Sequence, residues 1–289
     1  MKTAEPSARA PSRTADPADL EREIERLRAE LDAERRRTRD ELAFARRVQL
    51  NLMPIASPPV TGWEIATAYQ PAREVGGDFF DLYLLPSDPT TLGFVVADVT
   101  GKGITAALMM AFTRAVLRAA AYNGTGPADA LRRTNRVLVR EARTGLFLTA
   151  FVGWLDTVTG RLRWSSAGHE PPFLVRAGRR RLGRPTQLEE AGELLGMFAD
   201  LHVSDRTTTL RPGDVLIVPT DGAAEARNTR GEFFGDERVA AVVGRYGQDG
   251  AKAIIGALEF QLERFRGDAS PADDITLVGI ARAGDGRAP

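Results

Sequence analysis

The sequence predicts an α+β fold that is preceded by a long N-terminal helix. Three observations support this prediction: a heptad-like apolar pattern before Pro54, short apolar strands after Pro59, and helices that are grouped between runs of strands instead of alternating with them. With 289 residues, of which 43% are hydrophobic, the chain is long enough for one large domain or two small ones.

Residues 1–19 contain Ala, Pro, Ser, Thr, Arg and Asp without an apolar period, so we expect them to be disordered. Leu20, Ile24, Leu27 and Leu31 then have the spacing of a coiled-coil seam, which resumes in a shifted phase and ends before Pro54. A charged helix packed on its own domain is the alternative. The narrow apolar stripe favours a stalk at 20–53 that links two copies in a parallel homodimer.

The compact domain is expected over residues 55–282, with a loose tail at 283–289. Apolar runs separated by turn residues predict strands at 63–69, 79–85, 92–99, 147–155, 161–166, 172–175, 214–219 and 275–281. Longer periodic segments predict helices at 102–121, 127–143 and 251–265.

Composition excludes several kinds of chemistry. The chain has no cysteine and only two histidines, so disulfides, thiolate nucleophiles, cysteine-ligated zinc and a His-based triad lack their residues. Any metal should therefore be a hard ion bound by oxygen. The net charge of +0, the absence of an 18-residue apolar run and the polar N-terminus favour a cytoplasmic protein without nucleic-acid or membrane partners. The arginines at 35–37 do not change this, because acidic residues surround them.

Aspartates recur where apolar strands begin or end, beside small or turn residues. These are Asp78, Asp98, Asp221 and the pair Asp273–Asp274. One such aspartate is usually a turn former or a helix cap. Four such sites in one domain would repel one another unless shared protons or divalent cations offset the charge. Two Mg²⁺ or Mn²⁺ ions fit, because they lower the pKa of a bridging water and remove the need for a side-chain nucleophile.

Two further features bear on phosphate chemistry. Arg73 precedes Asp78 by five residues and could bind phosphate oxygens with its planar guanidinium, although a surface salt bridge is the simpler role. The glycine-rich turn after Asp98 could suggest a P-loop. That motif requires glycine where Val96 stands and serine or threonine where Gly103 stands, so the P-loop interpretation fails.

The ordered motifs resemble those of the SpoIIE/RsbU branch of the metal-dependent PPM (type-2C-like) protein phosphatases. The matching segments span about residues 45–282 and are AREVGGDFFD at 72–81, ADVTGKG at 97–103, SAGHEPP at 166–172, PGD at 212–214, TDGAAEAR at 220–227, GEFFG at 231–235 and DDIT at 273–276. Each motif is weak by itself, but the complete and ordered set is specific.

This resemblance implies a PPM-type sandwich of two antiparallel β-sheets flanked by helices, with two metals at one end. Asp78, Asp98, Asp221 and Asp273 would act through bound Mn²⁺ or Mg²⁺, with the backbone carbonyl of Val99 as a further ligand. Asp274 is an alternative to Asp273. Arg73 would bind the substrate phosphate, and His169 is expected to be structural.

The resemblance also implies a function in bacterial partner switching and sigma factor regulation. The expected substrate is phosphoserine or phosphothreonine on a STAS-domain anti-sigma factor antagonist, and a regulator could bind the stalk. The alternatives are a non-catalytic scaffold with the same fold and a metal-dependent hydrolase of small phosphomonoesters.

Overall fold

The computed structural model describes residues 17–141, 145–178, 185–189 and 192–284. The prediction of a disordered N-terminus therefore concerns mostly residues outside the described ones, as does most of the predicted tail. The chain divides into two units, residues 1–45 and 46–289, and the boundary lies inside the first helix.

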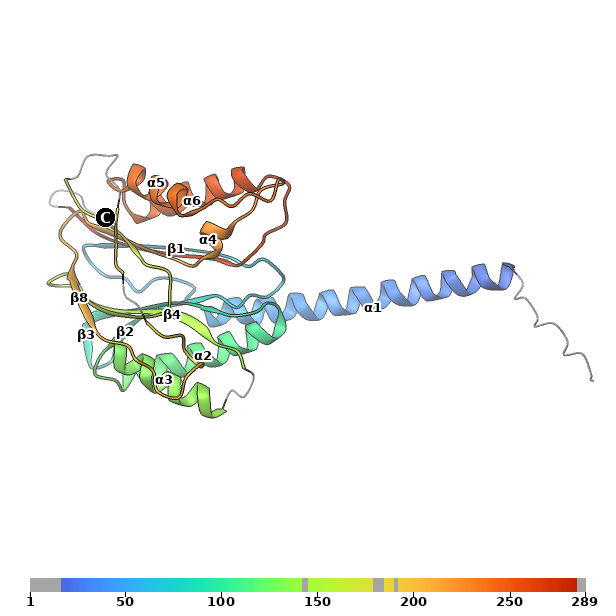
Figure 1. Ribbon diagram of the computed structural model, residues 1–289, viewed down its shortest axis with the longest axis horizontal. Coiled ribbons are helices and arrows are strands. Elements are labelled where there is room, and N and C mark those ends of the chain that lie inside the picture. Colours follow the sequence, from blue (N-terminus) through green and yellow to red (C-terminus); the bar gives the residue numbers. More distant parts are fainter. Residues whose placement is uncertain (1–16, 142–144, 179–184, 190–191, 285–289) are drawn as a thin grey trace, which may run out of the picture. The chain divides into compact units, whose positions relative to one another are not determined.

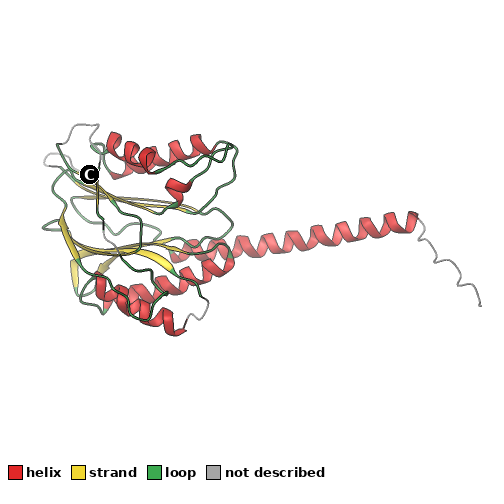
Figure 2. Ribbon diagram, in the orientation of Figure 1, coloured by secondary structure: helices red, strands yellow, loops and turns green. Residues whose placement is uncertain are grey.

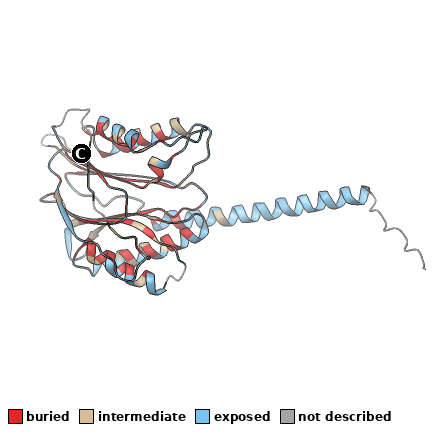
Figure 3. Cartoon of the chain, viewed as in Figure 1, coloured by how far each residue is buried: buried red, intermediate tan, exposed pale blue. Residues whose placement is uncertain are grey.

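Helix α1 (Pro17–Leu52) supplies all of the described part of the first unit. It begins three residues before the predicted start, because proline is well accommodated in the first turn of a helix. The seam residues Leu20, Ile24, Leu27 and Leu31 remain 43–56% exposed, and this part of α1 is coloured as exposed in Figure 3. The helix prediction is confirmed, and the apolar seam is uncovered in a single chain.

The second unit contains two antiparallel sheets (Figures 1 and 2). In order across the first sheet, the strands are β2 (Phe79–Leu85), β3 (Asp88–Val99), β4 (Leu148–Asp156), β5 (Arg161–Ala167) and β8 (Arg206–Thr209). In the second they are β1 (Trp63–Gln70), β10 (Ile275–Arg282), β9 (Val215–Pro219), β6 (Phe173–Val175) and β7 (Thr186–Gln187).

Helices cover the outer face of each sheet. Helices α2 (Ile104–Tyr122) and α3 (Pro127–Glu141) pack on the first sheet, and α5 (Asp236–Tyr246) and α6 (Ala251–Arg266) pack on the second, as Figure 1 shows. The short α4 (Gly222–Glu225) follows β9. The predicted architecture, a sandwich of two antiparallel sheets flanked by helices, is confirmed.

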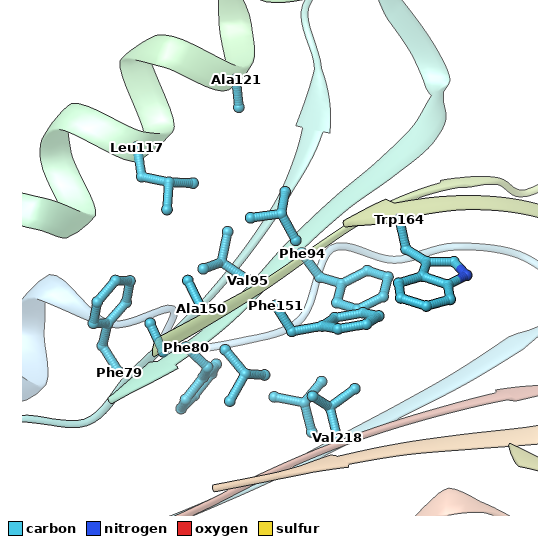
Figure 4. Close-up of a cluster of buried hydrophobic side chains, with 14 of the residues drawn as sticks. Phe79, Phe80, Phe94, Val95, Leu117, Ala121, Ala150, Phe151, Trp164 and Val218 are labelled. Carbon is cyan, nitrogen blue, oxygen red and sulfur yellow. The ribbon is translucent and has the colours of Figure 1, made fainter. Parts of the chain in front are cut away.

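The main core lies around the first sheet and between the two sheets (Figure 4). Phe94, Phe151 and Trp164 stack along β3, β4 and β5 with ring centroids 6.0 and 5.3 Å apart. Gly153 makes this possible, because a Cβ at that position would lie 2.2 Å from the Phe94 ring. A second cluster fills the space between the second sheet and its helices.

Helix α2 is long and apolar enough to cross a membrane, judged by length and composition alone. However, Met110, Thr113 and Leu117 are fully buried in it, and it packs on β2, β3 and α3. Packing in the core therefore accounts for its apolar composition.

Candidate metal centre

Strand register brings the predicted aspartates together in pairs. In the hairpin of β2 and β3, Phe79 pairs with Ala97, so Asp78 and Asp98 follow as neighbours at the open end. In the second sheet Leu277 pairs with Pro219, which places the residues after β9 beside those before β10. Asp221 and Asp273 thus meet at one end of that sheet.

Asp78 joins the two sheets. Its side chain is 1% exposed, and its Oδ2 accepts hydrogen bonds from the hydroxyls of Thr220 (2.7 Å) and Thr276 (2.8 Å). Burial, followed by the charges of Asp98 and Asp274, raises its pKa well above the ordinary value despite these two hydrogen bonds. The two threonines lie in the recognised motifs, but the sequence did not reveal that they orient Asp78.

Asp98 and Asp221 are in a similar electrostatic environment. Burial and the charges of Asp273 and Asp274 raise the pKa of Asp98, whose carboxyl group is close enough to hydrogen-bond to Asp78. Burial, followed by the charges of Asp98 and Glu225, raises the pKa of Asp221 to about 7. These carboxyl groups therefore belong to one cluster of mutually repelling charges.

The Asp273–Asp274 pair separates into two roles. Asp274 is 8% exposed and faces backbone: its Oδ1 accepts from the amide of Ala72 (2.7 Å) and its Oδ2 from the amide of Gly77 (2.6 Å). Asp273 instead forms an ion pair with Lys102 (Oδ2–Nζ, 2.8 Å), whose Nζ also donates to the carbonyl of Ala272. Both carboxylates thus have partners on both oxygens, since Oδ1 of Asp273 accepts the amide of Asp274 (3.0 Å). Asp274 is buried against backbone whereas Asp273 is partly exposed, so Asp273 remains the predicted ligand of the pair.

Close backbone approaches explain the glycines around the cluster. A Cβ on Gly77 would lie 2.7 Å from the carbonyl oxygen of Val99, and one on Gly222 would lie 1.8 Å from the carbonyl oxygen of Asp274. Glycine at 77 thus lets its segment pass close to the Val99 carbonyl, the predicted carbonyl ligand.

Arg73 and His169 differ in their surroundings. Arg73 is exposed, and it makes no hydrogen bond or ion pair with any residue that the structure describes, so the predicted alternative of a surface salt bridge is not seen. His169 is buried, and its Nδ1 lies 2.8 Å from the hydroxyl of Thr149. Burial lowers the pKa of His169 to about 4, which keeps the ring neutral and agrees with a structural role.

The oxygen donors of these residues are of the kind that binds a divalent metal, although they are not arranged as a complete coordination sphere. Among the described residues, no three carboxylate or histidine side chains are already arranged around one point as ligands. The fit comes from the donor set, since Asp78 and Asp98 adjoin with raised pKa values and, among the described residues, the cluster has an ion pair with Lys102 alone. Oxygen donors in excess of positive charge are what Mg²⁺ and Mn²⁺ prefer.

Comparison with known proteins decides the family. The model of the Stage II sporulation protein E (SpoIIE) family matches residues 88–283. The chain belongs to the SpoIIE family. This agrees with the resemblance seen in the sequence, and the chain thus carries a domain of the PP2C-type serine/threonine phosphatases.

Two relatives of this SpoIIE-family chain are Protein IcfG of Synechocystis sp. and the phosphoserine phosphatase RsbU of Bacillus subtilis. IcfG is 30% identical over 270 residues, which cover 84% of this chain and 41% of IcfG. RsbU is 26% identical over 244 residues, which cover 84% of this chain and 70% of RsbU. The chain thus spans about two fifths of IcfG.

Two solved structures share the fold. The SiaA-PP2C domain of Pseudomonas aeruginosa superposes with a TM-score of 0.75 at 22% identity, covering 86% of this chain and 98% of that domain. RsbX, solved in complex with magnesium, superposes with a TM-score of 0.56 at 15% identity, covering 78% of this chain and 98% of RsbX. At these identities the similarity concerns the fold.

Proposed function

We propose that this chain is a Mg²⁺- or Mn²⁺-dependent protein phosphatase that removes phosphate from phosphoserine or phosphothreonine on a STAS-domain anti-sigma factor antagonist. The observation that carries the proposal is the convergence of Asp78, Asp98, Asp221 and Asp273 from two sheets, with too little positive charge to balance them. Membership of the SpoIIE family and the likeness to RsbU support the substrate class.

The two metal ions would be held by Asp78, Asp98, Asp221, Asp273 and the Val99 carbonyl. When bound, such ions supply a nucleophile from water at neutral pH and neutralise charge on phosphate oxygens. The hydroxyls of Thr220 and Thr276 orient Asp78 from the opposite sheet, and Asp274 holds the segment that carries Arg73. The exposed guanidinium of Arg73 would bind the phosphate oxygens of the substrate bidentately.

The alternatives have less support. A non-catalytic scaffold would not need to retain all four aspartate sites in a repulsive cluster. For a small phosphomonoester, the cavity beside Asp221 gives no support, because neither Asp78 nor Asp98 lines it and it holds only about 10 Å³ of water-accessible space. Pockets that enclose small ligands usually measure about 300 Å³ or more. The partial exposure of Asp98, Asp221 and Asp273 suits a phosphorylated segment of a protein.

The decisive experiment follows phosphate release from a phosphorylated STAS-domain protein with Mn²⁺, with Mg²⁺ and with EDTA. We expect activity with a metal and none with EDTA. Asp98→Asn or Asp221→Asn should lower kcat/KM by about 10³-fold, because each removes a carboxylate from the charge-stabilising site. Full activity in EDTA would refute the metal-dependent mechanism. Faster turnover of small phosphate esters than of the phosphoprotein would favour a metal-dependent hydrolase of small phosphomonoesters.

The substrate itself can be sought by affinity capture. A phosphatase that binds but turns over slowly should retain its phosphoprotein, so immobilised Asp98→Asn protein is the suitable probe. The wild-type protein is the control, since it should release the dephosphorylated partner. Recovery of a phosphorylated STAS-domain protein on the variant alone would identify the partner.

We further propose that residues 20–53 are a regulatory stalk in a cytoplasmic homodimer and that a regulator can bind there. The exposed seam of Leu20, Ile24, Leu27 and Leu31 supports this, since such a stripe suits a partner helix. Light scattering should give twice the chain mass at micromolar concentration, and deletion of residues 1–40 should yield a monomer with altered activity. A monomeric full-length chain and unchanged activity after the deletion would contradict the proposal.

A further inference from the structure

The segment between β1 and β2, residues 71–78, carries both Arg73 and Asp78 and has no regular secondary structure. Its backbone amides and carbonyls therefore need partners from elsewhere in the chain. Two buried side chains that are far apart in the sequence supply them. These are Asp274, described above, and Gln49, which lies near the end of α1.

Gln49, in the last turns of α1, makes two hydrogen bonds to the backbone of Gly76. Its Nε2 donates to the Gly76 carbonyl (2.7 Å), and its Oε1 accepts from the Gly76 amide (3.1 Å). Gln49 is 5% exposed, whereas its neighbours Val48 and Leu50 are 46% and 41% exposed. All of these contacts lie inside the unit that begins at Arg46. This buried amide therefore faces into the compact domain, although it stands on a helix that is otherwise exposed.

Asp274 holds the same segment from β10 through the amides of Ala72 and Gly77. Gly76 is confined between the two side chains. A Cβ on Gly76 would lie 2.3 Å from Asp274 Oδ2 and 2.6 Å from the Tyr69 hydroxyl. The Gly76 backbone is therefore held between two contacts. Asp274 and Tyr69 leave no room on one side, and the hydrogen bonds to Gln49 hold it on the other.

Arg73 makes no hydrogen bond or ion pair with any described residue, so its position depends mainly on the backbone of its segment. We propose that Gln49 is a positioning residue: by holding Gly76 it fixes the segment so that Arg73 faces the same site as Asp78. This inference rests on the proposed function, because the phosphate that Arg73 would bind belongs to the substrate.

The test compares Gln49→Met with Asn51→Met in the full-length chain. Methionine has nearly the length of glutamine but makes neither hydrogen bond, and Asn51 is an exposed amide on the same turn of the helix. In Gln49→Met, hydrogen exchange of the amides in 72–78 should become faster. The inhibition constant of inorganic phosphate should rise and kcat/KM should fall, each by about 10- to 100-fold, because a misplaced binding group loses most of its benefit. Asn51→Met should behave as wild type.

A double-mutant cycle with Arg73→Ala separates positioning from a general loss of stability. If Gln49 acts through Arg73, Gln49→Met should have little further effect on phosphate inhibition once Arg73 is alanine. Additive effects in this cycle, or unchanged exchange and phosphate inhibition in a folded Gln49→Met protein, would overturn the inference. A wild-type protein without phosphatase activity would refute the proposed function instead. Hydrogen exchange would then still test whether Gln49 restrains the backbone at Gly76.

Discussion

Asp78 and Asp81 stand three residues apart at the start of β2, and each is 1% exposed, yet they have opposite surroundings. Asp81 accepts hydrogen bonds from Arg118 (Nε, 2.6 Å), from Arg114 (Nη2, 3.0 Å) and from the amide of Leu82 (3.1 Å). Asp78 meets two hydroxyls and the negative charges of Asp98 and Asp274. The two carboxylates differ in the charge around them rather than in burial.

Strand parity produces this difference. Alternate residues of a strand point to opposite faces, so Asp78 and Asp81 project to different sides of the first sheet. Asp81 faces α2, from which Arg114 and Arg118 reach it, and Arg118 also lies 4.5 Å above the Tyr83 ring. Asp78 faces the second sheet, where Thr220 and Thr276 lie. Removing one partner from a buried carboxylate–cation cluster is strongly destabilising, whereas a buried carboxylate without internal cations takes up a proton or needs a cation from solution.

The largest effect on stability should follow from Asp81→Asn. Neutralising Asp81 leaves two partly buried arginines without their charge partner, and we expect a loss of about 3 kcal/mol in the free energy of unfolding. Urea denaturation checks this, with the exposed Asp268→Asn as a control that should change the value by less than about 0.5 kcal/mol. Mn²⁺ affinity should stay unchanged. A weaker affinity in the Asp81 variant would mean that both carboxylates serve the metal centre.

The Asp273–Asp274 pair offers a second comparison. Asp274→Asn presents an amide nitrogen to backbone amides, so the segment from Ala72 to Asp78 should shift and kcat/KM should fall by about 10- to 100-fold. Asp273→Asn should instead abolish binding of at least one metal ion. Calorimetric titration with Mn²⁺ distinguishes the two variants. Loss of a metal ion in Asp274→Asn with normal binding in Asp273→Asn would reverse the assignment.

The cluster should make the metal-free protein less stable as the pH rises. The pKa of Asp221 is about 7 in the folded state against an ordinary value of 3.8, so between these pH values the folded state binds more protons than the unfolded one. The free energy of unfolding in EDTA should therefore fall by about 2 kcal/mol from pH 4 to pH 8, allowing for solvent screening of this partly exposed group. Thermal unfolding at several pH values measures it. Mn²⁺ should abolish the decline, and a metal-free protein that gains stability over this range would contradict the prediction.

The smallest effect concerns Asp78→Asn. In EDTA this variant should be about 1 kcal/mol more stable than wild type at pH 8, because it removes one charge from a repulsive cluster while an amide oxygen can still accept from Thr220. The same variant should gain no stability from Mn²⁺. Denaturation curves with and without metal test both statements, and a strongly destabilised variant would place Asp78 in the same class as Asp81.

Much of the fold could be predicted from the chain. The pattern of apolar runs gave β2 with its observed bounds and most other elements to within a few residues. The polar strands β7 and β8 were missed, since Thr186–Gln187 and Arg206–Thr209 lie at sheet edges and show no apolar alternation. Helix α5 was also missed, because it is short and follows a glycine-rich segment.

The candidate site was predicted in part. Strand ends beside glycines indicated Asp78, Asp98 and Asp221, since a carboxylate at a strand end is held at the edge of a sheet. The Asp273–Asp274 pair could not be divided, because adjacent residues share the same local pattern and differ only in what they contact. Gln49 was not predicted as a site residue, since a glutamine on a charged helix resembles any other surface residue.

The sequence by itself determined the α+β class and the abundance of oxygen ligands in a chain without cysteine, because these follow from composition and local pattern. Its ordered motifs carried the family resemblance, and the two-sheet architecture was an implication of that resemblance. Only the tertiary structure decided which carboxylates lack cations, which of two adjacent aspartates binds the amides of Ala72 and Gly77, and which glutamine holds Gly76. The physical reason is that charge compensation and hydrogen bonding depend on partners as far apart as Ala72 and Asp274, which meet only when both sheets have formed.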